Sequence, residues 1–207
     1  MGKIIQEQFG QALMDSIISF AQQDIPTPRE LEQTKFAHVD DVDVRKALAD
    51  TMYGARWLYK LGLALLVQNE EQFAHVRAQV IDYASVCETL LGEMIIHGVT
   101  KGHIGGSTFQ FNDYHKKKKI HWATITNIRN KIEGTHFWWR ICVAEENFII
   151  KPSTAAALEK LKNHRNTVHI TEKVRSGVSY YIGLTRNAYT ITNDVIDQTI
   201  QWKSQRP

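Results

Sequence analysis

The chain has 207 residues, of which 43% are hydrophobic and 23% are charged, and its formal net charge is +3 at pH 7. These proportions are typical of a folded globular protein, and they exclude a disordered chain. The small positive charge neither requires nor excludes a nucleic acid partner, because a binding surface depends on where the charges cluster. The length favours one domain, residues 1–207, with an irregular insertion.

The cysteines and the hydropathy pattern bear on the cellular compartment. Cys87 and Cys142 lie in apolar surroundings without the spacing of metal ligands, so they predict core thiols in a reducing compartment. No segment approaches the roughly 18 consecutive apolar residues of a membrane span, and no long apolar stretch of a leader follows Met1. We therefore expect a cytoplasmic protein with no membrane partner.

The first predicted element is a helix within residues 1–23. Its apolar side chains recur at steps of three and four and so form one stripe, made of Ile5, Phe9, Leu13, Ile17 and Phe20. Two prolines in the segment 24–28 cannot continue a helix. This segment is expected to be a linker.

Two long helices are predicted next, over residues 42–67 and 71–97. The first begins after the acidic residues Asp40, Asp41 and Asp43, whose charge suits the exposed amides of a helix start. The connection between the helices is short, with Asn69 as the expected cap of the second helix. A short connection predicts an antiparallel pair packed side by side.

Glycines within the first long helix predict a close neighbour. Gly54 and Gly62 each cost about 1 kcal/mol relative to alanine inside a helix. Such a cost is tolerated where another helix approaches closely. We therefore expect a helix to pack against the face that carries them.

Residues 98–121 lose the helical pattern and contain several glycines, which predicts a loop. A run of four lysines lies at its end, Lys116, Lys117, Lys118 and Lys119, and Trp122 follows. The lysines are suited to RNA phosphates and the indole ring to stacking on a base. The alternative is a solvated loop without a ligand.

The second half of the chain predicts further helices. One starts near Trp122 and ends at Gly134, and another starts at Pro152. Residues 136–143 are aromatic and β-branched, and they are compatible with either a short strand or a helix. After an interruption that contains β-forming residues, a final helix is expected to begin near Thr190.

The helix from Pro152 ends in a motif of Arg165, Asn166 and His169. If the helix continues, Arg165 and His169 lie on one face with Cβ atoms about 5–6 Å apart. A guanidinium offers a planar fork of donors to phosphate oxygens, and an imidazole exchanges protons near neutral pH. A pair of cations that only favours the helix C-terminus is the alternative. The motif therefore indicates a site for a phosphate.

This pattern of arginine, polar spacer and histidine at the end of a late helix resembles the HEPN superfamily. The segments 43–62 and 79–91 resemble the helical hairpin that such proteins place before the motif. The resemblance implies an all-α fold, an HEPN-like helical bundle with irregular loop insertions. Three residues separate Arg165 from His169, which is fewer than the superfamily usually has.

The resemblance also implies an activity, because many members are metal-independent endoribonucleases. His169 would act as general base or acid in attack of a 2′-hydroxyl on the adjacent phosphate, with Arg165 stabilising the negative charge and Asn166 orienting the histidine or a phosphate oxygen. One histidine cannot readily serve both ends of the scissile bond, so a homodimer is expected. RNA would be the substrate and no metal or cofactor would be required. A toxin or antiphage effector of this type would also have an antitoxin or other regulatory partner.

Two alternatives remain open. The short spacing favours a catalytically inactive HEPN-fold module that binds RNA or acts as a scaffold or regulator. A helical protein of another class could instead bind a nucleotide or a small anion through Arg165 and His169. His164, adjacent to Arg165, points about 100° away on a helix and predicts a surface or core histidine.

Overall fold

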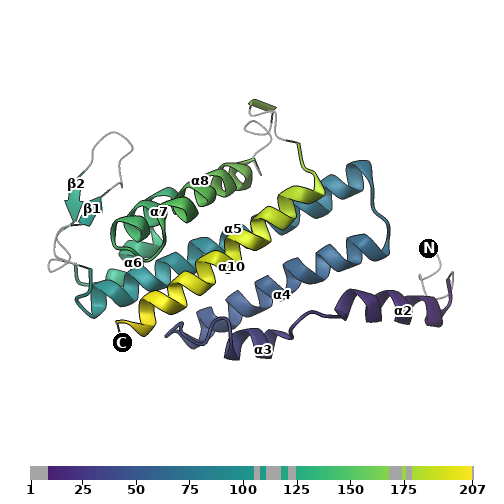
Figure 1. The fold of residues 1–207 in the computed structure, drawn as a ribbon, viewed down its shortest axis with the longest axis horizontal. Helices are drawn as coiled ribbons and strands as arrows, with labels where there is room; N and C mark the ends of the chain where they lie inside the picture. The colour runs from purple at the N-terminus through teal and green to yellow at the C-terminus, as the bar shows by residue number, and fades with distance from the viewer. Residues whose placement is uncertain are drawn as a thin grey trace.

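The computed structural model describes residues 9–104, 108–110, 118–120, 125–167, 174–175 and 179–206. The helices are α2 (Gln11–Gln22), α3 (Pro28–Gln33), α4 (Val42–Ala64), α5 (Asn69–Thr100), α6 (Ile128–Glu133), α7 (Phe137–Glu146), α8 (Pro152–Asn166) and α10 (Ile182–Ser204). Two short strands, β1 (Thr108–Gln110) and β2 (Lys118–Ile120), pair antiparallel. The predicted all-α fold is confirmed (Figure 1).

The centre of the bundle is α5, which contacts α4, α6, α7, α8 and α10. Its fully buried side chains include Tyr83, Leu90, Leu91, Met94 and Ile95. A helix surrounded by other helices is apolar on most of its faces. Even so, no helix within the described ranges is long and apolar enough to cross a membrane.

The predicted antiparallel pair is confirmed as α4 and α5, which lie side by side (Figure 1). Asp41 is the N-cap of α4, because its Oδ1 accepts hydrogen bonds from the Asp43 and Val44 amides, both at 3.1 Å. The expected cap of α5 is wrong. Gln68 precedes the helix without a side-chain cap, and Asn69 is the first helical residue, at φ 48°.

The two glycines of α4 differ in their surroundings. A Cβ on Gly62 would meet His75 Nδ1 of α5 at 3.4 Å, so the expected close approach is confirmed there. A Cβ on Gly54 would meet nothing within 4 Å, so the prediction is wrong at that position. Gly54 therefore lies on a face of α4 that no neighbouring helix covers closely.

The predicted N-terminal helix is confirmed over α2, but the face on which it was expected to pack is wrong. Gly10, at φ 81°, precedes α2, which covers Gln11–Gln22, and residues 1–8 lie outside the described residues. Although α2 packs on α4, its predicted stripe stays largely in solvent, since Phe9 is 61% and Phe20 is 41% exposed. Ala21 is the buried residue of this helix. Spacing alone therefore did not identify the face that packs.

Residues 98–121 have more regular structure than predicted. The helix α5 continues to Thr100, and β1 pairs with β2 so that Thr108 lies opposite Ile120. Pairing of this kind provides partners for backbone groups that a loop would leave to solvent. The prediction of a loop throughout this segment is therefore wrong, although residues 105–107, 111–117 and 121 lie outside the described ranges.

The later helices correct two predicted starts and resolve one open alternative. Within the predicted helix from Trp122, α6 covers only Ile128–Glu133, with Gly134 as its C-cap. Residues 136–143, left open between strand and helix, belong to α7. The last helix begins at Ile182 rather than near Thr190, because Leu184 and Thr185 are buried as α10 packs along α5.

The two cysteines form no disulfide within the described residues, and both pack in or against the core, as predicted. Cys87 is fully buried in α5, and its Sγ lies 3.4 Å from the Thr192 hydroxyl of α10. Burial raises the pKa of Cys87 to about 12, because the thiolate would lose its hydration. Cys142 on α7 is partly buried against the same core. Both residues therefore act as packing groups.

Candidate functional site

The helix that contains most of the motif starts at Pro152, as predicted, and packs on α5 and α10. It ends at Asn166, where the Thr167 hydroxyl donates to the His164 carbonyl at 2.5 Å and also contacts the Tyr180 hydroxyl. The helix α8 therefore ends before His169, so α8 does not meet the condition under which Arg165 and His169 share one helix face. His169 itself lies outside the described residues.

Arg165 points from α8 toward α5. Its Nη2 lies 3.0 Å from Oε2 of Glu88, and the two side chains are 39% and 18% exposed. The ion pair holds one edge of the guanidinium while part of the group remains accessible to solvent. Asn166 is partly buried beside it. The structure thus places Arg165 and Asn166 together at the end of α8.

His164 faces a different part of the bundle, as its position next to Arg165 predicted. It lines a hollow of about 470 Å³ between α8 and α10, together with Lys160, Tyr181 and Asn187. Its Nδ1 is buried and has no hydrogen-bond partner within the described part of the chain. Burial lowers the pKa of His164, because the imidazolium would lose its hydration. His164 and Arg165 therefore do not form one site.

A second arginine, which is buried and which the sequence analysis did not identify, lies near Arg165. Arg140 of α7 donates to the Glu88 carbonyl at 2.9 Å and the Glu133 carbonyl at 3.0 Å, and it also bonds Ile132 and Thr135. Burial lowers the pKa of Arg140, and the positive charge of Arg165 acts in the same direction, whereas the carboxylates around it oppose the shift. Arg140 on α7 therefore connects α7 with α5 and with the end of α6 through hydrogen bonds.

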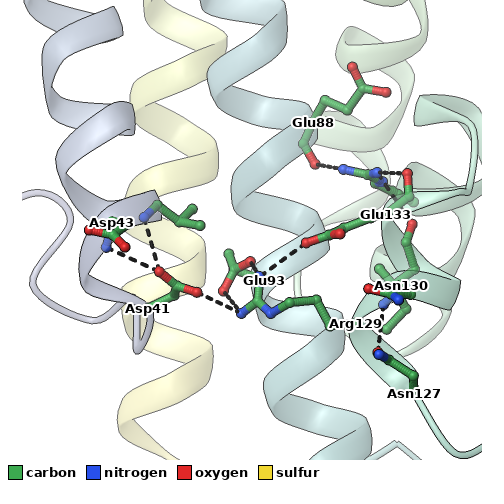
Figure 2. A network of polar contacts seen from close by, with 11 residues as sticks. Asp41, Asp43, Glu88, Glu93, Asn127, Arg129, Asn130 and Glu133 are labelled. Atoms are coloured by element: carbon green, nitrogen blue, oxygen red, sulfur yellow. Dashed lines mark hydrogen bonds and ion pairs between the residues drawn. The ribbon is translucent and has the colours of Figure 1, made fainter.

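A third arginine completes this network (Figure 2). Arg129 of α6 donates two hydrogen bonds, of 2.6 and 3.0 Å, to the carboxylate of Glu93 on α5. Its Nη2 also lies 3.3 Å from the Asp41 carboxylate at the start of α4. Glu133 adds a contact at 3.4 Å. The hydrogen bond with Glu93 is the main cause that raises the pKa of Arg129. The network therefore joins α4, α5 and α6.

The sequence contained a signal for this network. Glu88 and Glu93 lie among the apolar residues of the segment 71–97. Burying a carboxylate there costs free energy unless a cation or a hydrogen-bond donor pairs with it. Each of them requires a cation from another element. Periodicity alone did not identify Arg165 and Arg129 as the partners of these two carboxylates, because the arginines follow more than 30 residues later in the chain.

The predicted RNA-binding residues are only partly described. Lys116, Lys117 and Trp122 lie outside the described residues. Lys118 and Lys119 belong to β2, where their backbones pair with Gln110 and Phe109 of β1. The structure therefore places two of the four lysines on a strand.

Comparison with known proteins found no match for this chain. No family model matches it, and neither the curated proteins nor the solved structures include a match. Within the ranges that the structure describes, no three His, Cys, Asp or Glu side chains are grouped to hold a metal ion.

Proposed function

We propose that the chain is a metal-independent endoribonuclease of the HEPN type that acts as a homodimer. The observation that supports this best is the position of Arg165, which is oriented by Glu88 at the end of α8 and keeps part of its guanidinium exposed. An arginine fixed in this way is prepared to stabilise a phosphate without reordering its own side chain. Asn166 lies next to it, and His169 follows shortly in the sequence.

In the proposed reaction the 2′-hydroxyl attacks the adjacent phosphorus and the bond to the 5′-oxygen of the next nucleotide breaks. His169 transfers the proton, and Arg165 stabilises the negative charge on the phosphate. A second His169, from the other protomer, serves the other end of the bond. Such an activity is harmful to a growing cell, so the proposal includes a toxin or antiphage effector that a partner protein controls.

A non-cleaving module is the second candidate, and a specific observation favours it. The Glu88 carboxylate already neutralises part of the charge of Arg165, and α8 ends before His169. In this alternative the HEPN-like bundle binds RNA, or acts as a scaffold or regulator, without cutting. Lys116 to Lys119 and Trp122 then provide the contacts to RNA.

The deciding experiment is cleavage of a single-stranded RNA in excess chelator, with the products analysed for a 2′,3′-cyclic phosphate. Replacing His169 or Arg165 by alanine is expected to lower the rate by about 10²–10⁴, the range for a positioned acid or base. Lys162→Ala, a cation on the same helix, is the matched control and should retain the rate. Binding of RNA without cleavage by the wild-type protein would favour the module instead.

The lysines and the assembly are tested separately. Replacing Lys116 to Lys119 by alanine should weaken RNA binding and reduce its dependence on salt, while the rate at saturating RNA stays unchanged. Sedimentation should show a dimer at micromolar concentration. A monomer that still cleaves RNA would contradict the proposed two-histidine mechanism.

A further inference from the structure

A hollow at the opposite end of the bundle from the arginine network has the properties of a ligand site. It measures about 260 Å³ and lies between the C-terminal end of α4, the first turns of α5 and the start of α10. Its walls are mainly apolar, with Leu63, Val76 and Ile182 from these three helices. Apolar walls with a few placed polar groups are typical of small-molecule sites.

Three residues that line this hollow each have a buried polar atom with no hydrogen-bond partner within the described part of the chain. These atoms are Gln79 Oε1, Thr185 Oγ1 and His75 Nδ1. Gln79 and Thr185 are each only 2% exposed. The Gln79 amide nitrogen donates to the His75 carbonyl at 2.9 Å, which fixes the amide and leaves its oxygen free. Buried polar atoms normally have partners, so this group indicates a missing one.

A second hollow of about 330 Å³ shares Tyr59 and Thr185 with the first. It is lined by two arginines, Arg56 and Arg186, and neither forms an ion pair among the described residues. The guanidinium carbon of Arg56 lies 4.4 Å from the centre of the Tyr189 ring. Stacking on an aromatic ring orients a guanidinium and leaves its N–H edge available to an anion.

We propose that the two hollows together bind a small organic anion with a flat, mainly apolar body that contains an N–H or O–H donor. The donor is required because the Gln79 carbonyl oxygen can only accept a hydrogen bond. An alkyl chain would leave that oxygen and the Thr185 hydroxyl unpaired, which opposes binding. The anionic group lies on Arg56 and Arg186, where charge-assisted hydrogen bonds are strongest. This site is independent of Arg165 and His169.

The first test measures binding of three probes to the full chain by titration calorimetry. Indole-3-acetate has the ring, the N–H donor and the carboxylate, whereas 1-naphthylacetate lacks the donor and indole lacks the charge. We expect indole-3-acetate to bind, and each of the other two to bind about 3–10-fold more weakly. Equal affinities for indole-3-acetate and 1-naphthylacetate would contradict the role of Gln79. Absence of a binding heat with indole-3-acetate at about 1 mM would contradict the site itself.

The second test uses variants that separate binding from folding. Thr185→Val and Arg186→Gln should each weaken indole-3-acetate about 3–10-fold. The matched controls are Thr192→Val on the same helix, whose hydroxyl already donates to the Ala188 carbonyl, and Arg29→Gln on the exposed face of α3. Both controls should retain wild-type affinity. Loss of binding in the controls, or its retention in both site variants, would contradict the proposal.

Discussion

Polar side chains enter the bundle at two places, and they differ in whether their hydrogen bonds are satisfied. Around Glu88 and Glu93, three arginines meet carboxylates and backbone carbonyls from neighbouring helices. Around Gln79 and Thr185, buried polar atoms have no partner within the described chain. Both groups lie on or against α5, so the helix alone does not explain the difference.

The difference separates a structural role from a binding role. A buried polar network stabilises a fold when every member has a partner, and each unpaired group costs about 1–3 kcal/mol. The arginine network therefore connects helices, whereas the unpaired group is retained at a cost to stability. A ligand that supplies the missing partner would recover that cost, which is why substitutions at the two places should act in opposite directions.

The largest expected effect is at Arg140. Replacement by leucine removes hydrogen bonds to Glu88, Glu133, Ile132 and Thr135 from a side chain that is only 9% exposed. Each of these buried or partly buried groups loses its hydrogen bond to the guanidinium, so we expect the free energy of unfolding to fall by about 3–5 kcal/mol. Urea denaturation measures this change. A loss below about 1 kcal/mol would mean that the network is not structural.

The pH dependence of stability at His38 measures the free-energy cost of a buried group without a partner. Its Nδ1 is buried without a partner among the described residues, and burial, helped by the charge of Lys203, lowers its pKa from 6.5 to about 4. The unfolded chain therefore takes up the proton first, and stability should fall as pH drops from 6.5 to 4. We expect His38 to account for about 1–2 kcal/mol of this fall, allowing for its partial exposure. In urea denaturation at a series of pH values, His38→Gln should show a shallower decline, and an unchanged slope would contradict the assignment.

The ion pair between Arg165 and Glu88 should contribute less. Both groups are partly open to solvent, so a double-mutant cycle of Arg165→Gln and Glu88→Gln should give a coupling of about 0.5–1 kcal/mol. Urea denaturation of the four proteins measures it at low and high salt. A coupling that does not weaken in salt would indicate a pair more shielded than its exposure implies.

The smallest effect has the opposite sign. Thr185→Val keeps the shape of the side chain and removes an unpartnered hydroxyl, so stability without ligand should rise by about 0.5 kcal/mol. Thr192→Val should instead lower stability by about 1 kcal/mol, because its hydroxyl donates to the Ala188 carbonyl. Thermal melting of the two variants compares them directly. A loss of stability in both would remove the distinction between the two groups.

Periodicity predicted the helices better than their ends. The pair α4 and α5 and the start of α8 at Pro152 follow from apolar spacing and from the proline and aspartate signals. The start of α10 was not predicted, because β-forming residues precede and enter this helix. The packing face of α2 was not predicted, because its apolar stripe is exposed. The structure gives the positions of Arg165 and Asn166 in the candidate site, whereas the role of His169 remains a prediction.

The sequence by itself determined the all-α class and the long helical pair, because helix spacing and caps depend on residues within a few positions of one another. Only the tertiary structure decided which polar residues meet. Glu93 pairs with Arg129 and Glu88 pairs with Arg165 across distant parts of the chain, while Gln79 and Thr185, which line the hollow, each have a buried oxygen without a partner among the described residues. Such pairings depend on how whole helices pack, and no local pattern contains that information.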